Sequence, residues 1–150
     1  MNSKSALTLK SCPIKVGITF GDPSGIGPTI IAKALPRIKG LAEFVVIGDW
    51  SVFKRAGAKT GKREDYRFID LSNVKNKGFT FGKIRAEYGK ASLEYLDKAL
   101  DLINREEIDC LVTCPISKEA IALAGFNLGG HTEYLANRTN TKDFVMMLLN

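Results

Sequence analysis

The residues most suited to chemistry in this chain surround its single histidine. His131 follows two glycines and precedes Thr132 and Glu133, in the segment GGHTE. An imidazole and a hydroxyl in a polar, glycine-bordered segment favour contact with a polar ligand over burial in an apolar core. Thr132 has an alternative role as the N-cap of a following helix. One histidine without a carboxylate or thiolate at ligand spacing does not fill a metal coordination shell, so we expect no metal site within this chain.

A glycine-rich segment, GDPSGIGP at residues 21–28, is a second place where a ligand could approach the backbone. Glycine tolerates a positive φ, and the start of a helix offers unpaired N–H groups to an anion. The spacing is neither GxGxxG nor that of a Walker A loop. Gly21, Gly25 and Gly27 are therefore candidates for cofactor binding, with a tight turn that binds nothing as the alternative. We expect Gly25 to need the conformational freedom of glycine, so that Gly25→Val would lower stability, cofactor affinity or both.

The segment TCPISKE, residues 113–119, follows an expected strand, at the end where ligands of open α/β sheets bind. Lys118 could bind a phosphate or a carboxylate there, although an exposed lysine in a first helical turn explains it equally well. Cys110 lies in an apolar run and is expected in the core. Cys114 ends that run without a nearby histidine to activate it, which does not favour a nucleophilic role.

Apolar runs of strand length alternate with helical patterns along the chain, which predicts an α/β fold with a mostly parallel sheet flanked by helices. Pro36 is expected to end or kink the first helix, and Ser51 and Ser117 to cap two later ones. The last apolar run reaches the end of the sequence without a covering helix, so we expect exposed apolar surface and poor solubility. The expected strands span residues 15–20, 44–48, 66–71, 108–113 and 144–149, and the helices span residues 29–35, 51–56, 85–104 and 117–124, with a short one after His131.

Composition narrows the classes of function. The chain has 150 residues, 45% hydrophobic and 25% charged, as in an ordinary soluble protein, with residues 1–13 as a leader and 14–150 as one α/β portion. The net charge is +6, but Glu64 and Asp65 interrupt the basic residues of 54–67, and aromatic residues do not alternate with them as a base-stacking platform would require, which argues against nucleic acid. No apolar run approaches the ~20 residues that span a membrane. Three cysteines without CxxC spacing indicate reduced thiols and a cytoplasmic protein.

These segments together resemble the 4-hydroxythreonine-4-phosphate dehydrogenase family. The matches are ITFGDPSGIGP at 18–28, TCPISKEAI and AGF within 113–126, GGHTEYLA at 129–136 and VMML at 145–148. Their order and spacing agree, and the resemblance covers nearly the whole chain after the leader. The GDPSGIGP loop is the less specific part, because isocitrate and isopropylmalate dehydrogenases carry a similar GDGIGPE loop.

The resemblance implies a fold and a reaction. Family members are homodimers of two-domain α/β subunits, related in fold to isocitrate and isopropylmalate dehydrogenases. They oxidise 4-phosphohydroxy-L-threonine with NAD or NADP in vitamin B6 synthesis, and the product then loses carbon dioxide. A divalent metal such as zinc, cobalt or magnesium polarises the hydroxyl. His131 and Thr132 match the family's substrate-contacting pair, and Cys114 stands where other members have glycine, which should affect packing more than chemistry.

This chain resembles only the amino-terminal part of the family. The three metal-binding histidines and the phosphate-binding residues of the family lie beyond the position that matches Asn150. Two alternatives stay open: a dehydrogenase of a related four-carbon sugar-acid phosphate, erythronate or threonate 4-phosphate, and a truncated remnant that has lost catalysis.

We predict that this chain of 150 residues, assayed alone, does not reduce NAD with any phosphohydroxy acid, with or without added zinc, cobalt or magnesium. By the resemblance, the site needs three further histidines and the other side of an interdomain cleft. Metal-dependent turnover by a monodisperse preparation of this chain would contradict the prediction.

Overall fold

The computed structural model describes residues 13–58, 65–127 and 129–148. The leader expected at residues 1–13, which includes Cys12, lies outside the described residues except for Pro13. Within the described ranges, none of the helices combines the length and apolar character needed to cross a membrane.

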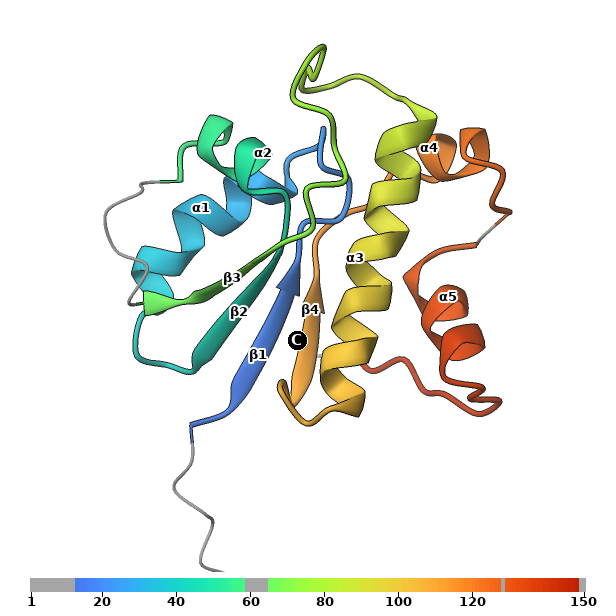
Figure 1. Cartoon of the computed structure of the whole chain (residues 1–150). Helices are drawn as coiled ribbons and strands as arrows, with labels where there is room; N and C mark the ends of the chain where they lie inside the picture. The colour runs from blue at the N-terminus through green and yellow to red at the C-terminus, as the bar shows by residue number, and fades with distance from the viewer. Residues whose placement is uncertain (1–12, 59–64, 128, 149–150) are drawn as a thin grey trace, which may run out of the picture.

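Four parallel strands form a sheet in the order β3-β2-β1-β4 (Figure 1). Ile18 of β1 pairs with Val46 of β2 on one side and with Val112 of β4 on the other. The parallel α/β sheet expected from the alternating pattern is thus confirmed. The strands are β1 (Lys15–Thr19), β2 (Glu43–Gly48), β3 (Arg67–Asp70) and β4 (Cys110–Thr113).

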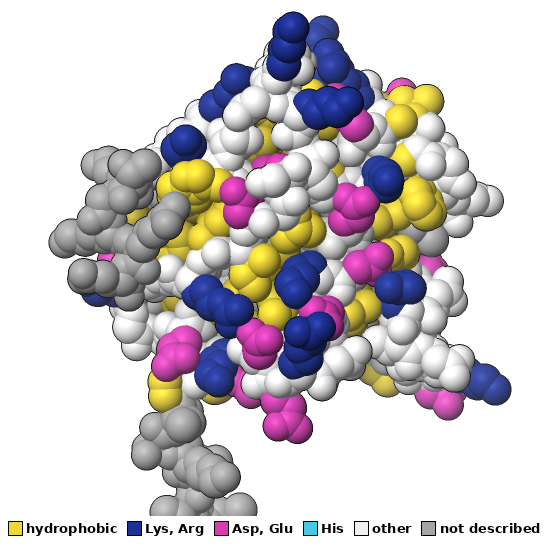
Figure 2. Space-filling view, in the orientation of Figure 1, with side chains coloured by type: hydrophobic (Ala, Val, Ile, Leu, Met, Phe, Trp, Pro, Cys, Tyr) yellow, Lys and Arg dark blue, Asp and Glu magenta, His cyan; other side chains and the backbone are white. Residues whose placement is uncertain are grey.

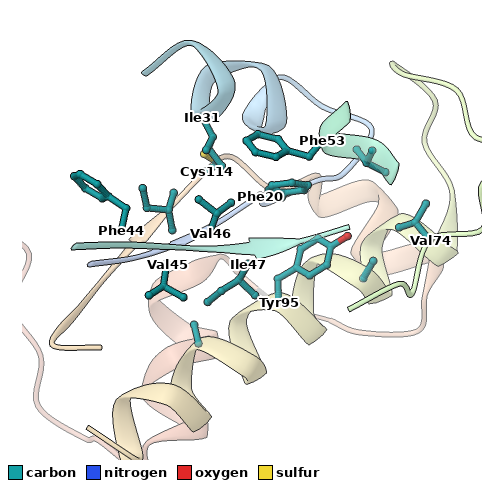
Figure 3. Close-up of a cluster of buried hydrophobic side chains, with 14 of the residues drawn as sticks. Phe20, Ile31, Phe44, Val45, Val46, Ile47, Phe53, Val74, Tyr95 and Cys114 are labelled. Atoms are coloured by element: carbon teal, nitrogen blue, oxygen red, sulfur yellow. The ribbon is translucent and has the colours of Figure 1, made fainter. Parts of the chain in front are cut away.

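Helices cover both faces of the sheet, as the crossover connections of a parallel sheet require. The helices α1 (Gly27–Ile38) and α2 (Trp50–Arg55) pack on one face, and α3 (Ala86–Asn104) packs on the other (Figures 1 and 3). Two shorter helices, α4 (Lys118–Leu123) and α5 (His131–Arg138), pack against α3 through a small apolar cluster.

The core lies between these layers and β2. In Figure 3, Val46 points toward the α1 and α2 face, where Phe20 also lies, whereas Val45 and Ile47 point toward α3, from which Tyr95 rises. All five side chains are buried. Alternation with a period of two sends successive side chains of β2 to opposite layers, and both layers are apolar. This explains why β2 reads as a continuous apolar run in the sequence.

Two helix boundaries differ from the sequence prediction. The helix α1 continues through Pro36 to Ile38, so the prediction that Pro36 ends it is wrong. Pro36 is exposed, and water can bond the carbonyl group that loses its helical N–H partner there. The helix α2 begins at Trp50 with Asp49 as its N-cap, so Ser51 is not the cap.

The strand predicted at residues 144–149 is not formed by the described part of that segment, residues 144–148. Residues 141–148 belong to no helix or strand, and Val145 and Leu148 are 91% and 88% exposed. A strand needs a neighbour for its backbone hydrogen bonds, and no strand of the described ranges pairs with this segment.

Cys110 is exposed, so the prediction that it lies in the core is wrong. It belongs to β4, an edge strand whose one described partner is β1.

Asp49 ties the carboxyl end of β2 to the loop between β3 and α3. Its carboxylate is 1% exposed and accepts hydrogen bonds from Val74 N at 2.9 Å and from the Tyr95 hydroxyl at 2.5 Å. Burial raises the pKa of Asp49, and these two bonds act in the opposite direction because they stabilise the charged form. The carboxylate is therefore unavailable to cap α2, and it organises the loop instead.

We predict that Tyr95→Phe lowers the free energy of unfolding by about 1.5–3 kcal/mol, because Asp49 loses a partner in a buried setting. Tyr88→Phe is a matched control: the Tyr88 hydroxyl is buried and has no hydrogen-bond partner among the described residues. Its removal should cost nothing, or stabilise by about 1 kcal/mol. Urea denaturation of both variants measures the difference, and equal losses would show that the bond to Asp49 is not the cause.

The turn after β1 is packed too tightly for side chains at two of its glycines. Gly21 has a φ of 65°, and a Cβ there would collide with the carbonyl oxygens of Cys114 and Pro115. A Cβ at Gly27 would collide with the carbonyl oxygen of Phe20 and lie 2.8 Å from the Cβ of Cys114. At Gly25 the nearest atom would be 3.3 Å away, and its φ is not left-handed. Gly25 therefore lacks the left-handed conformation that the sequence predicts for it, and the tightest constraints lie at Gly21 and Gly27. The effect of Gly25→Val on stability and cofactor affinity stays a prediction.

We predict that Gly21→Ala lowers the free energy of unfolding by about 2–5 kcal/mol, from a left-handed φ together with steric overlap. Gly40→Ala separates the two causes, since Gly40 has a φ of 81° with nothing within 4 Å of the added Cβ. It should lose only about 1–2 kcal/mol. Gly25→Ala should lose less than either, and a larger loss there in chemical denaturation would restore the original prediction.

Candidate functional site

The glycine-rich turn and the segment after β4 meet at the carboxyl ends of the parallel strands. Asp22 N donates to the Pro115 carbonyl at 2.9 Å, and Cys114 N donates to the Thr19 carbonyl at 3.2 Å. Since β1 and β4 are neighbours, both connections leave the sheet at the same edge. Open α/β sheets bind ligands at this edge, so the structure brings two of the three predicted segments together there.

His131 joins the same place through Cys114. Burial lowers the pKa of His131 from its ordinary value of 6.5, and a hydrogen bond with the Cys114 backbone acts in the opposite direction. A carbonyl that accepts from the ring has this second effect because it favours the protonated imidazole. Nε2 is buried and has no hydrogen-bond partner among the described residues. An unpaired buried nitrogen of this kind calls for a specific explanation.

The start of α5 places the His131 and Thr132 side chains. Gly130 is the N-cap, with an extended φ of 165°, so Thr132 is the second helical residue and not the cap. The carboxylate of Glu133 folds back over Gly129, where an added Cβ would lie 2.7 Å from Oε1. The hydroxyl of Thr132 is partly exposed and makes no hydrogen bond to the described part of the chain. It is therefore free to contact a ligand.

Cys114 and Lys118 differ in how far they support a chemical role. Cys114 is buried, and burial raises the pKa of its thiol to about 11, so it is protonated near neutral pH and suits packing against Gly27. Lys118 is exposed at the first position of α4, with no ion pair to the described residues. Ser117 caps α4 as predicted, accepting from Ala120 N at 3.2 Å. An anion-binding role for Lys118 stays a prediction.

A third connection, which sequence reasoning missed, lies against the glycine-rich turn. Ser24 is buried, and its hydroxyl donates to the Lys83 carbonyl at 2.6 Å, while Gly82 N donates to the Ser24 carbonyl at 2.8 Å. The paired residues Ser24 and Lys83 are 59 positions apart in the sequence. No local pattern in the sequence indicates such a contact.

A metal centre does not fit the residues present here. Within the described ranges, no group of three or more His, Cys, Asp or Glu side chains could hold a metal ion. His131 could supply only one imidazole. The protein chain itself fills the space beside Gly21 and Gly27, so packing accounts for these two glycines. Cofactor binding by Gly21, Gly25 and Gly27 therefore stays a prediction.

A cavity of about 610 Å³ lies at the opposite edge of the sheet, around the amino ends of β1, β2 and β3. Four of its six charged lining residues form ion pairs: Lys39 contacts Asp65 at 2.7 Å, and Arg67 contacts Glu107 at 2.7 Å. None of the predicted site residues lines it. Its size alone does not make it a binding site, and its charges are largely balanced.

Comparisons with known proteins agree with the resemblance. The family model described as Pyridoxal phosphate biosynthetic protein PdxA matches residues 29–150. A D-threonate 4-phosphate dehydrogenase from Cupriavidus necator is 36% identical over 152 residues, which cover 89% of this chain and 45% of that protein. A 4-hydroxythreonine-4-phosphate dehydrogenase from Sulfurihydrogenibium sp. is 34% identical over 148 residues, which cover 91% of this chain and 46% of that protein.

The fold agrees as well. The crystal structure of a 4-hydroxythreonine-4-phosphate dehydrogenase from Klebsiella pneumoniae superimposes with a TM-score of 0.81 at 28% identity, over 95% of this chain and 48% of that one. This chain thus spans about half the length of the relatives that it matches. From its family-model match and its fold, the chain belongs to the PdxA family, whose named relatives are dehydrogenases.

Proposed function

We propose that this chain forms one side of the active site of an NAD- or NADP-dependent dehydrogenase that oxidises 4-phosphohydroxy-L-threonine, with decarboxylation of the product, in vitamin B6 synthesis. The names of the relatives support a phosphorylated hydroxy acid as the substrate class. We further propose a cytoplasmic homodimer that needs a divalent metal (zinc, cobalt or magnesium), with ligands from outside this chain.

The observation that carries the proposal is the unpaired Nε2 of His131 at the carboxyl edge of the sheet. A buried polar atom without a partner costs about 1–3 kcal/mol, which a substrate group that bonds it would recover. Burial favours the neutral imidazole, in which one ring nitrogen accepts a hydrogen bond and the other donates one. A substrate hydroxyl can either donate to Nε2 or accept from it, and the hydroxyl of the next residue, Thr132, can bond a second polar group of the same substrate.

The second candidate is a dehydrogenase of threonate or erythronate 4-phosphate. The Cupriavidus relative carries the threonate name at 36% identity, against 34% for the hydroxythreonine enzyme, and this difference does not separate the two substrates. The substrates share a phosphate and a secondary hydroxyl but differ in an amino group. The ratio of kcat/KM for the two substrates, measured on the protein expressed from its complete gene, decides between them.

We predict that His131→Ala and Thr132→Ala each lower kcat/KM for the phosphorylated substrate about ten- to hundredfold, because each removes a hydrogen bond to a polar or charged group worth about 1.5–3 kcal/mol. Metal content and NAD affinity should stay close to those of the parent. Thr139→Ala, on the exposed end of α5, is the matched control and should leave all three unchanged. A variant that arrives without metal and recovers with excess metal would mean that the residue is a ligand or supports one, and the assignment would be wrong.

A further inference from the structure

The loop between β3 and α3, residues 71–85, is strongly basic. It carries four cationic residues and no Asp or Glu. Figure 2 shows Lys and Arg side chains gathered at the top of the molecule, where Figure 1 places this loop beyond the carboxyl ends of the strands. The cationic residues are Lys75, Lys77, Lys83 and Arg85. Positive charge therefore gathers beyond the carboxyl ends of the strands.

The structure holds this loop at several points. Val74 N donates to the buried carboxylate of Asp49, and the Phe79 carbonyl accepts from Arg55 Nη1 at 3.1 Å. Val74 and Phe79 are buried in the core, at 5% and 6% exposed. Near its end, the loop donates a hydrogen bond from Gly82 N to the Ser24 carbonyl and accepts one from the Ser24 hydroxyl at the Lys83 carbonyl. The cationic side chains therefore extend from a loop whose backbone is held by hydrogen bonds and by burial of Val74 and Phe79.

Lys83 differs from Lys75 and Lys77, which are also exposed without an ion pair to a described residue, in that its backbone bonds the glycine-rich turn. Its carbonyl accepts the Ser24 hydroxyl, so its backbone is fixed beside the glycine-rich turn. Its side chain is exposed and makes no ion pair with the described residues, whereas Arg85 pairs with Glu87 at 3.3 Å and lies over the Tyr88 ring. The backbone of Lys83 is thus fixed, and no ion pair with a described residue neutralises its ammonium group.

The nearest acidic group in the turn does not cancel that charge. Asp22 is buried, burial raises the pKa of its carboxyl, and Oδ1 is bonded to Ser24 N at 2.9 Å. The Asp22 carboxylate therefore accepts a hydrogen bond within the turn itself. On the other side of the turn, Pro115 leads to the exposed Lys118, which is followed by the exposed Glu119.

We propose that Lys83 binds a phosphate group of the ligand at this edge, supplied either by the phosphorylated substrate or by the dinucleotide, and that Ser24 is its positioning residue. The proposal deepens the proposed function and rests on it for the identity of the ligand. A lysine ammonium is a compact charge that suits a phosphate oxyanion, and a fixed backbone reduces the entropy lost when the side chain engages it.

The test uses the protein expressed from its complete gene, with inorganic phosphate and pyrophosphate as calorimetric probes. Lys83→Ala should raise the Kd for at least one probe about tenfold, as expected for losing one charge-assisted contact, and Lys83→Arg should restore most of the affinity. Lys77→Ala is the matched control, with the same charge on the same loop, and should leave the Kd within about twofold. Ser24→Ala should weaken binding in the parent but add nothing in the Lys83→Ala background.

The kinetic constants then identify the source of the phosphate. A rise in KM for the phosphorylated acid indicates the substrate, and a rise in KM for NAD indicates the dinucleotide. The proposal is wrong if the parent binds neither probe at millimolar concentration, if Lys83→Ala binds both probes like the parent, or if Lys77→Ala loses as much. Probe binding through Lys83 in a protein that oxidises no phosphorylated hydroxy acid would support this inference while removing the proposed function.

Discussion

The backbone contact between the turn after β1 and the segment after β4 is the constraint on which the site depends. Asp22 donates to the Pro115 carbonyl, and Gly21 approaches Cys114 and Pro115 so closely that no side chain fits. The two connections can meet because β1 and β4 are parallel neighbours whose carboxyl ends share an edge. His131 bonds the backbone of the same Cys114. Displacing this contact would therefore move the glycine-rich turn and the histidine together.

Polar groups at the two ends of the sheet differ in burial and in hydrogen-bond pairing. At the carboxyl end, Asp22 and Asp49 are buried with raised pKa values, and Thr19 Oγ1 and His131 Nε2 have no partner in the described part of the chain. At the amino end, the charges around the cavity stay partly exposed and paired. Buried polar atoms without partners cost stability, and they are tolerated most often where a ligand or a reaction uses them. This contrast favours the carboxyl ends of the strands as the candidate site, although the 610 Å³ cavity lies at the other end.

Local sequence patterns predict much of the architecture. Apolar alternation and strand-length runs predicted the four parallel strands, and helical periodicity predicted α3 to within one residue at its start. Ser117 was recognised as a cap because capping is a local hydrogen bond. The polar, glycine-bordered setting of His131 and Thr132 predicted a contact role, and the structure places His131 against the backbone of Cys114, after the carboxyl end of β4. Their binding of substrate remains a prediction.

The sequence by itself therefore determined the fold class, most of the elements and the family, since these follow from periodicity, capping and motif spacing. Tertiary structure alone decided which groups meet. Gly21 rather than Gly25 is constrained because the backbone of Cys114 and Pro115 lies against it. Cys110 is exposed because β4 lies at the edge of the sheet. The contact of Ser24 with Lys83 joins residues 59 positions apart. Strand order and packing between distant segments set all three, and neither is encoded in any short stretch of sequence.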